Sequence, residues 1–413
     1  MLRWTPALLL AAVAVISLLR TGVATGEILA YSGYWILTLL LPGTLVVRTI
    51  FRTERDLIQD LALGAVTGLA LEIASLFSLR ALGLEELVRF WWLVPLGLFI
   101  AVPRLRRIGF RRYDVWVRRG WAWSMAAMTT LLVMGLDLAW FQRNPLPPRG
   151  GIVYPDQWWH LAIVHELMRP GPTQVPQVAG EMFSYHFNVH GHMAVASRVT
   201  GIEPDVILFR LFLPPLILAA AGLIAFLAGE VSRRSWAGPI AVWLSLVALG
   251  GGYLWSEIGN LSKTPLRLAS PTQMLAMPFV LAAGWALVLL IRRSLDPWGW
   301  AWLGLVVLVG AGSKPTVTLT LLGGTLVALV AVAYVTRRFP RSVAIATGGL
   351  MLVQLWMLVD RSGSAANVNV LGSLKLMDVF REISGDVSMR GINEGLILDS
   401  LSSTAGLTAA AVA

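Results

Sequence analysis

The chain has 413 residues, of which 56% are hydrophobic and only 14% charged, and its mean hydropathy is +0.70. This composition is typical of a protein that lies in a bilayer. There is no cysteine, which excludes disulfides and thiolate chemistry. The net charge of +10 is explained mostly by basic membrane loops, which also suit anionic lipid headgroups, so it requires no nucleic-acid partner.

Apolar segments of about 20 residues, enough to cross a hydrocarbon core roughly 30 Å thick, recur along most of the chain. We therefore predict an all-α, polytopic integral membrane protein with about eleven transmembrane helices. The first is short and follows Arg3, so a signal peptide is the alternative there. In chain order the predicted helices are 5–19, 28–47, 57–79, 87–102, 121–141, 206–228, 237–255, 274–291, 298–312, 316–335 and 343–359.

These helices divide the chain into four parts. Residues 1–141 form an N-terminal membrane block, 142–205 an extracytoplasmic His-rich loop with interfacial helices, and 206–360 a second membrane block. Residues 361–413 form a more polar extracytoplasmic tail. The tail ends in an Ala-rich run typical of the start of another apolar helix, so we expect the chain to be a truncated version of something longer.

Arginine predicts the orientation, because basic loops stay in the cytoplasm. Arg20, Arg80 and Arg89 oppose the bias, but every even-numbered predicted helix is followed by a basic segment. We therefore predict a multi-pass plasma-membrane protein with a cytoplasmic N-terminus and an extracytoplasmic His-rich loop. The basic residues are Arg48, Arg52 and Arg55; Arg104, Arg106, Arg107, Arg111, Arg112, Arg118 and Arg119; Arg233 and Arg234; Arg292 and Arg293; and Arg337, Arg338 and Arg341.

All five histidines lie between His160 and His192, beside carboxylates. Histidine titrates near neutral pH and is the commonest metal ligand, so chemistry is expected in this segment. Pro155 and Asp156 suit the first turn of a short interfacial helix. On that helix Asp156 and His160 are four residues apart and share a face. We predict both as catalytic residues and as the start of a metal site.

A second polar segment supplies Tyr185, His186 and His190 as candidate substrate-binding residues, and His186 and His190 would share a helical face. With Asp156 and His160, these two histidines compose a chemically reasonable metal site, although plain hydrogen bonding would use the same residues. The cofactor is therefore left open, with Mg²⁺ or Mn²⁺ as the candidates.

Three cations near the predicted outer membrane face are further candidates for substrate binding. Lys314 interrupts an apolar hairpin that has almost no loop to solvate it, so it is a possible phosphate ligand, with snorkelling to the interface as the alternative. Arg210 and Arg267 are candidates for outer-face headgroup contacts.

Several enzyme classes lack their motifs. His165-Glu166-Leu167-Met168 is followed by Arg169, where a zincin protease needs a second histidine. There is also no Walker loop and no Gly-x-Ser-x-Gly nucleophile elbow, so ATP hydrolysis and serine hydrolase chemistry have no support.

The run Asp156-Gln157-Trp158-Trp159-His160, in an outer loop of a polytopic bundle, resembles the GT-C superfamily of membrane glycosyltransferases. The segment from Gly180 to His186 and the turn at Gly312-Ser313-Lys314 resemble parts of multi-pass proteins grouped with it. The resemblance implies transfer of a sugar from a polyprenyl-phosphate donor to a cell-envelope acceptor on the outer side. Asp156 would then act as general base or hold a divalent ion, and Lys314, with Arg210 or Arg267, would neutralise the lipid phosphate.

Two alternatives remain open. A transporter or lipid flippase with a His-rich outer gate predicts ionisable residues deep within the membrane helices, where Glu72 is the main candidate. A non-catalytic membrane scaffold with an outward assembly loop would tolerate the loss of Asp156.

Overall fold

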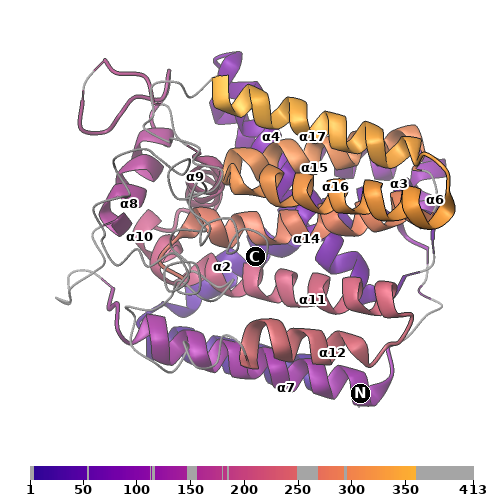
Figure 1. Ribbon diagram of the computed structural model, residues 1–413. Helices are drawn as coiled ribbons and strands as arrows, with labels where there is room; N and C mark the ends of the chain where they lie inside the picture. The colour runs from indigo at the N-terminus through magenta and orange to yellow at the C-terminus, as the bar shows by residue number, and fades with distance from the viewer. Residues whose placement is uncertain are drawn as a thin grey trace, which may run out of the picture. The chain divides into compact units, whose positions relative to one another are not determined.

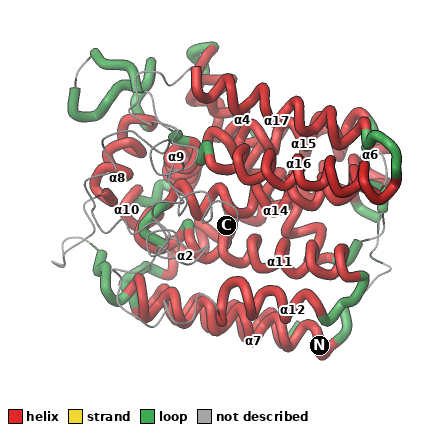
Figure 2. Tube along the Cα trace, in the orientation of Figure 1, coloured by secondary structure: helices red, strands yellow, loops and turns green. Residues whose placement is uncertain are grey.

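The computed structural model describes residues 4–53, 55–111, 113, 117–146, 156–178, 180–183, 186–248, 268–292 and 295–359. Every regular element in these ranges is a helix, and the isolated β-bridge between Gln174 and Met182 is not part of a strand (Figure 2). The predicted all-α class is confirmed for this part of the chain. The predicted tail, 361–413, lies outside the described residues.

The helices follow one another with short connections. They are α1 (Thr5–Arg20), α2 (Thr25–Tyr34), η1 (Trp35–Leu40), α3 (Leu41–Ile50), α4 (Leu57–Ala81), η2 (Glu85–Phe90), α5 (Leu93–Ala101), α6 (Pro103–Gly109), α7 (Arg119–Leu136), η3 (Asp137–Phe141), α8 (Asp156–Leu167), α9 (Asn188–Thr200), α10 (Pro204–Val206), η4 (Ile207–Leu211), α11 (Leu213–Ser232), α12 (Ala237–Val242), η5 (Trp243–Ala248), α14 (Pro271–Arg292), α15 (Pro297–Ser313), α16 (Thr316–Thr336) and α17 (Arg341–Val359).

Six helical stretches among the described residues are long and apolar enough to cross a membrane. Three of them run through π-helical turns, as where α2, η1 and α3 form one stretch over Thr25–Ile50. The others are Leu57–Ala81, Arg119–Phe141, Pro204–Ser232, Pro271–Arg292 and Thr316–Thr336. Four further apolar helices are shorter: Thr5–Arg20, Ala237–Leu246, Pro297–Ser313 and Arg341–Met357. The count of about eleven transmembrane helices stays a prediction.

The predicted helix 87–102 is not a single helix. The segment begins in the 3₁₀ turn η2 and continues, after a turn at Trp91 and Trp92, into α5, which has only 9 residues. Proline explains where α5 ends. The residue before a proline is disfavoured in the α conformation, and Val102, which precedes Pro103, has an extended backbone with ψ 106°.

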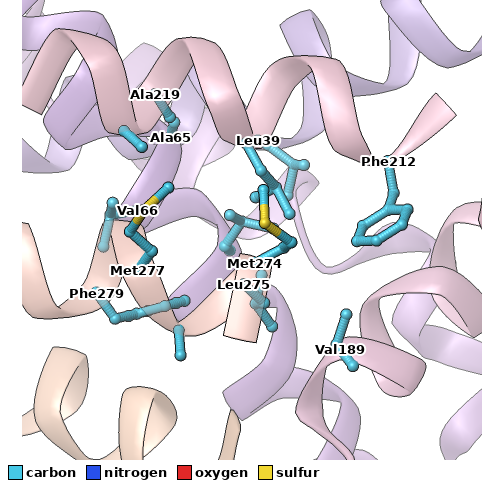
Figure 3. Close-up of a cluster of buried hydrophobic side chains, with 14 of the residues drawn as sticks. Leu39, Ala65, Val66, Val189, Phe212, Ala219, Met274, Leu275, Met277 and Phe279 are labelled. Carbon is cyan, nitrogen blue, oxygen red and sulfur yellow. The ribbon is translucent and has the colours of Figure 1, made fainter. Parts of the chain in front are cut away.

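The longer helices form a bundle with a continuous apolar core. Helices α11, α14, α15, α16 and α17 lie side by side in turn (Figure 1). In the core, Leu39 of η1 and Val66 of α4 lie close to Met274 of α14 (Figure 3). Helices α8 and α9 lie at one end of the bundle, and α6 and the α16–α17 turn lie at the other (Figure 1).

Glycines let α4 approach its neighbours closely. A Cβ atom added at Gly68 would overlap the carbonyl oxygen of Leu39, and one added at Gly43 would overlap that of Gly64. Small residues permit such backbone contact between membrane helices, where packing rather than the hydrophobic effect drives association. This contact fixes α4 against α2, η1 and α3, and therefore fixes Glu72 and Tyr34 relative to each other.

Helix α9 is the main departure from the predicted outer loop. It packs against α2, α4, α8, α14 and α15, and every residue from Asn188 to Ser197 is buried. A helix that carries two histidines is thus part of the interior at this end of the bundle, while α8 remains partly exposed.

Candidate functional site

Helix α8 presents one charged and one buried side chain. It begins at Asp156, as predicted, where a carboxylate interacts favourably with the positive end of the helix dipole. Asp156 is exposed, whereas His160, one turn later, has an exposed fraction of only 5%. The spacing of these two residues therefore places an accessible carboxylate beside a shielded imidazole.

Helix α9 supplies a second imidazole directly opposite the first. His160 Nδ1 lies 2.8 Å from His190 Nε2, and the rings stack with their centroids 5.0 Å apart. His190 is fully buried. Because one ring nitrogen must donate a proton and the other must accept it, the contact fixes complementary tautomers in the two histidines.

Burial keeps both rings uncharged near neutral pH. Burial lowers the pKa of His160 to about 4, an effect that the Asp156 carboxylate opposes and the Lys314 ammonium reinforces. Burial, followed by the neighbouring His160 and His186, holds the pKa of His190 well below its ordinary value, and a backbone hydrogen bond at Phe187 opposes this. Neutral imidazoles are suited to hydrogen bonding and proton relay rather than to binding anions by charge.

The turn between α15 and α16 brings Lys314 to the same place. Asn188, the first residue of α9, donates from Nδ2 to the carbonyl oxygen of Val309, 2.8 Å away. Gly312 packs against the same amide, since a Cβ atom there would lie 2.5 Å from Nδ2. The start of α9 is thus held against the end of α15, next to half-buried Lys314. We call Asp156, His160, His190 and Lys314 the His160 site.

The predicted metal site is not formed by the described residues. In that part of the chain no three His, Asp or Glu side chains lie close enough to hold a metal ion. The facing nitrogens of His160 and His190 are hydrogen-bonded to each other, so they are not arranged as two ligands of one ion. The geometry thus gives no support to Mg²⁺ or Mn²⁺ bound by Asp156 and His160.

Two other predicted residues differ from expectation. His186 does not share a helical face with His190, because α9 begins only at Asn188, although the two imidazoles are close enough for His186 to lower the pKa of His190. Arg210 is not a free headgroup ligand. Its side chain is buried and donates to the carbonyl oxygens of Thr21, Phe141, Asn144 and Phe209. Tyr185 and Arg267 lie outside the described residues.

Sequence reasoning missed the residues that support the site. Gln157 is buried and donates to the carbonyl oxygen of Ala269, 2.8 Å away, which ties α8 to the start of α14. It also missed that Glu72 meets His192 and Tyr34. An ionisable residue in an apolar helix was the available signal for Glu72, but 120 residues separate it from His192.

No family model, no curated protein and no solved structure matches this chain.

Proposed function

We propose that the protein is a membrane-embedded glycosyltransferase that moves a sugar from a polyprenyl-phosphate donor to an envelope acceptor on the extracytoplasmic side. The observation that carries the proposal is that Asp156 of α8 and Lys314 of the α15–α16 turn, opposite in charge, both act on the pKa of His160. An accessible carboxylate and an ammonium group thus share one site at one end of the bundle.

These charges suit the transfer chemistry. Asp156 would accept the proton of the acceptor hydroxyl as its oxygen forms a bond to the anomeric carbon of the sugar. The bond from that carbon to the phosphate oxygen breaks, and its electron pair leaves with the phosphate. Lys314 would stabilise the negative charge that develops there. The neutral His160–His190 pair would orient the reacting groups by hydrogen bonding, without adding a charge.

The surface of the bundle supports a membrane location. In α16 only 22% of the most apolar window is buried, and Val327, Val330 and Val335 are more than two-thirds exposed. Apolar surface of this kind is favourable in lipid. The Arg-bearing α6 and the α16–α17 turn lie at the end away from α8 and α9 (Figure 1), which supports an extracytoplasmic His160 site.

The proposal is tested by sugar transfer in vesicles that contain the purified full chain. Each of a panel of radiolabelled polyprenyl-phosphate sugars is supplied in turn, with an envelope extract as the acceptor. We expect transfer of one sugar class above the level in vesicles without the protein. If no donor in a panel of hexoses and pentoses supports transfer above that level, the glycosyltransferase proposal is wrong.

A specific observation favours the alternative of a transporter or flippase. Glu72 lies fully buried within the long helix α4 and contacts His192. Ionisable residues deep within membrane helices are typical of transport and proton pathways. Uptake or lipid movement that depends on a proton gradient, measured in the same vesicles, would support this alternative.

A further inference from the structure

A second polar cluster lies in the interior of the bundle, apart from the His160 site. We call Tyr34 of α2, Glu72 of α4 and His192 of α9 the Glu72 cluster. His192 Nδ1 lies 2.7 Å from Glu72 Oε1, and the Tyr34 hydroxyl donates a short hydrogen bond to Glu72 Oε2. Glu72 and His192 have no exposed surface, and Tyr34 is 3% exposed. Three helices thus meet at one carboxyl group.

The cluster has no permanent cation among the described residues, in contrast to the other buried carboxylate of α4. Asp60 pairs with Arg55 Nε at 2.6 Å and with Arg48 Nε at 3.4 Å, so its negative charge is balanced. The ion-pair partner of Glu72 is His192, which carries charge only when protonated. The other titratable side chain that adjoins the cluster is Tyr31, whose ring centroid lies 5.8 Å from that of Tyr34.

The number of protons in this cluster determines its net charge. With neither a carboxyl proton on Glu72 nor a second ring proton on His192, the pair carries a net charge of −1 in an apolar interior, which is costly. One additional proton makes it neutral. The arrangement that separates no charge has that proton on Glu72 Oε1, donated to His192 Nδ1, so the other ring proton is on Nε2. The distances between these atoms fit this arrangement.

Three polar atoms around the cluster have no hydrogen-bond partner in the described part of the chain. They are His192 Nε2, the Tyr31 hydroxyl and Trp35 Nε1. Trp35 lies edge-on to the His192 ring, with centroids 5.8 Å apart. A buried donor without an acceptor costs about 1–3 kcal/mol. These donors are therefore suited to a small hydrogen-bonding species such as water or hydronium.

We propose that the Glu72 cluster is an internal proton-binding site, with Tyr31 and Trp35 as neighbours that hold the water which delivers the proton. His192 Nε2 accepts a proton from hydronium, which leaves as water, and the proton on Nδ1 passes to Glu72 Oε1. The net charge of the pair changes from −1 to zero. The Tyr34 hydroxyl keeps its hydrogen bond to Oε2 throughout. The site does not depend on Asp156 or on sugar transfer.

Infrared spectroscopy of the full chain in vesicles tests this site. We expect a carboxylic-acid C=O band at neutral pH that is absent from Glu72→Gln and retained in Glu181→Gln, a control at an exposed carboxylate. In D₂O the band should shift while the amide II band of the buried helices persists, since that combination shows exchange without unfolding. In His192→Gln the shift should slow at least tenfold, because glutamine cannot relay a proton.

Two outcomes would overturn the proposal. One is a wild-type spectrum without a Glu72-dependent carboxylic-acid band, which would mean that Glu72 is ionised. The other is a band that never shifts in D₂O, which would mean that the proton is structural. If Glu72→Gln does not fold, Tyr34→Phe identifies the band instead, because loss of the hydrogen bond to Oε2 must change its frequency.

Discussion

Replacing Asp156 with asparagine is expected to lower kcat for sugar transfer by roughly 100- to 10,000-fold, the usual contribution of a general base. Asparagine has nearly the same size and still suits the start of α8, but it cannot accept the proton of the acceptor hydroxyl. The KM for the donor should change little, because donor binding depends on the phosphate and its contact with Lys314. Initial rates at saturating donor measure the effect.

Glu181→Gln is the matched control, since Glu181 is an exposed carboxylate in the same predicted outer segment. It should transfer sugar at the wild-type rate. If Asp156→Asn also keeps that rate at equal amounts of folded protein, Asp156 has no role in catalysis, and the base must be sought outside α8.

Replacing Arg210 with methionine is expected to destabilise the fold strongly. The guanidinium donates to the carbonyl of Thr21 at the end of α1 and to those of Phe141 and Asn144 at the end of η3. The last carbonyls of a helix have no partner within it, and a cation there also suits the helix dipole. Each carbonyl left without a donor costs about 1–3 kcal/mol. We expect Tm in detergent to fall by on the order of 10 °C.

Two further variants make this result specific. Arg210→Lys should recover only part of the loss, because an ammonium group lacks the planar fork that reaches several carbonyls. Arg169→Met should have little effect, because the Arg169 side chain is 77% exposed and forms only a surface ion pair. An Arg210→Met protein with wild-type Tm and a raised KM for the donor would instead make Arg210 a phosphate ligand.

Local sequence patterns predicted what local forces decide. The proline and aspartate before an apolar run predicted the start of α8, and the four-residue spacing predicted that Asp156 and His160 act together. Lys314 was predicted from its position in an apolar hairpin, and the structure has the helix break there, between α15 and α16. In each case the signal lies within a few residues.

Long-range contacts decided what the sequence did not predict. Polar α9 was expected in an outer loop, but its polar side chains find partners on other helices, such as Glu72 for His192 and Val309 for Asn188. Arg210 was expected at a headgroup, but π-helical turns η3 and η4 bring it to unpaired carbonyls. Such partners are distant in sequence, and a buried polar residue cannot be distinguished from an exposed one before they are known.

The most direct test of the His160 site is the pKa of His160, measured by NMR of the full chain with ¹⁵N-labelled histidine. We predict a pKa of about 4 for the wild type, against an ordinary value of 6.5. Asp156→Asn should lower it further and Lys314→Gln should raise it, because these charges favour and oppose the imidazolium respectively. His165→Gln, at an exposed histidine of the same helix, should leave it unchanged. A pKa near 6.5 that neither substitution moves would contradict the assembly of these residues into one site.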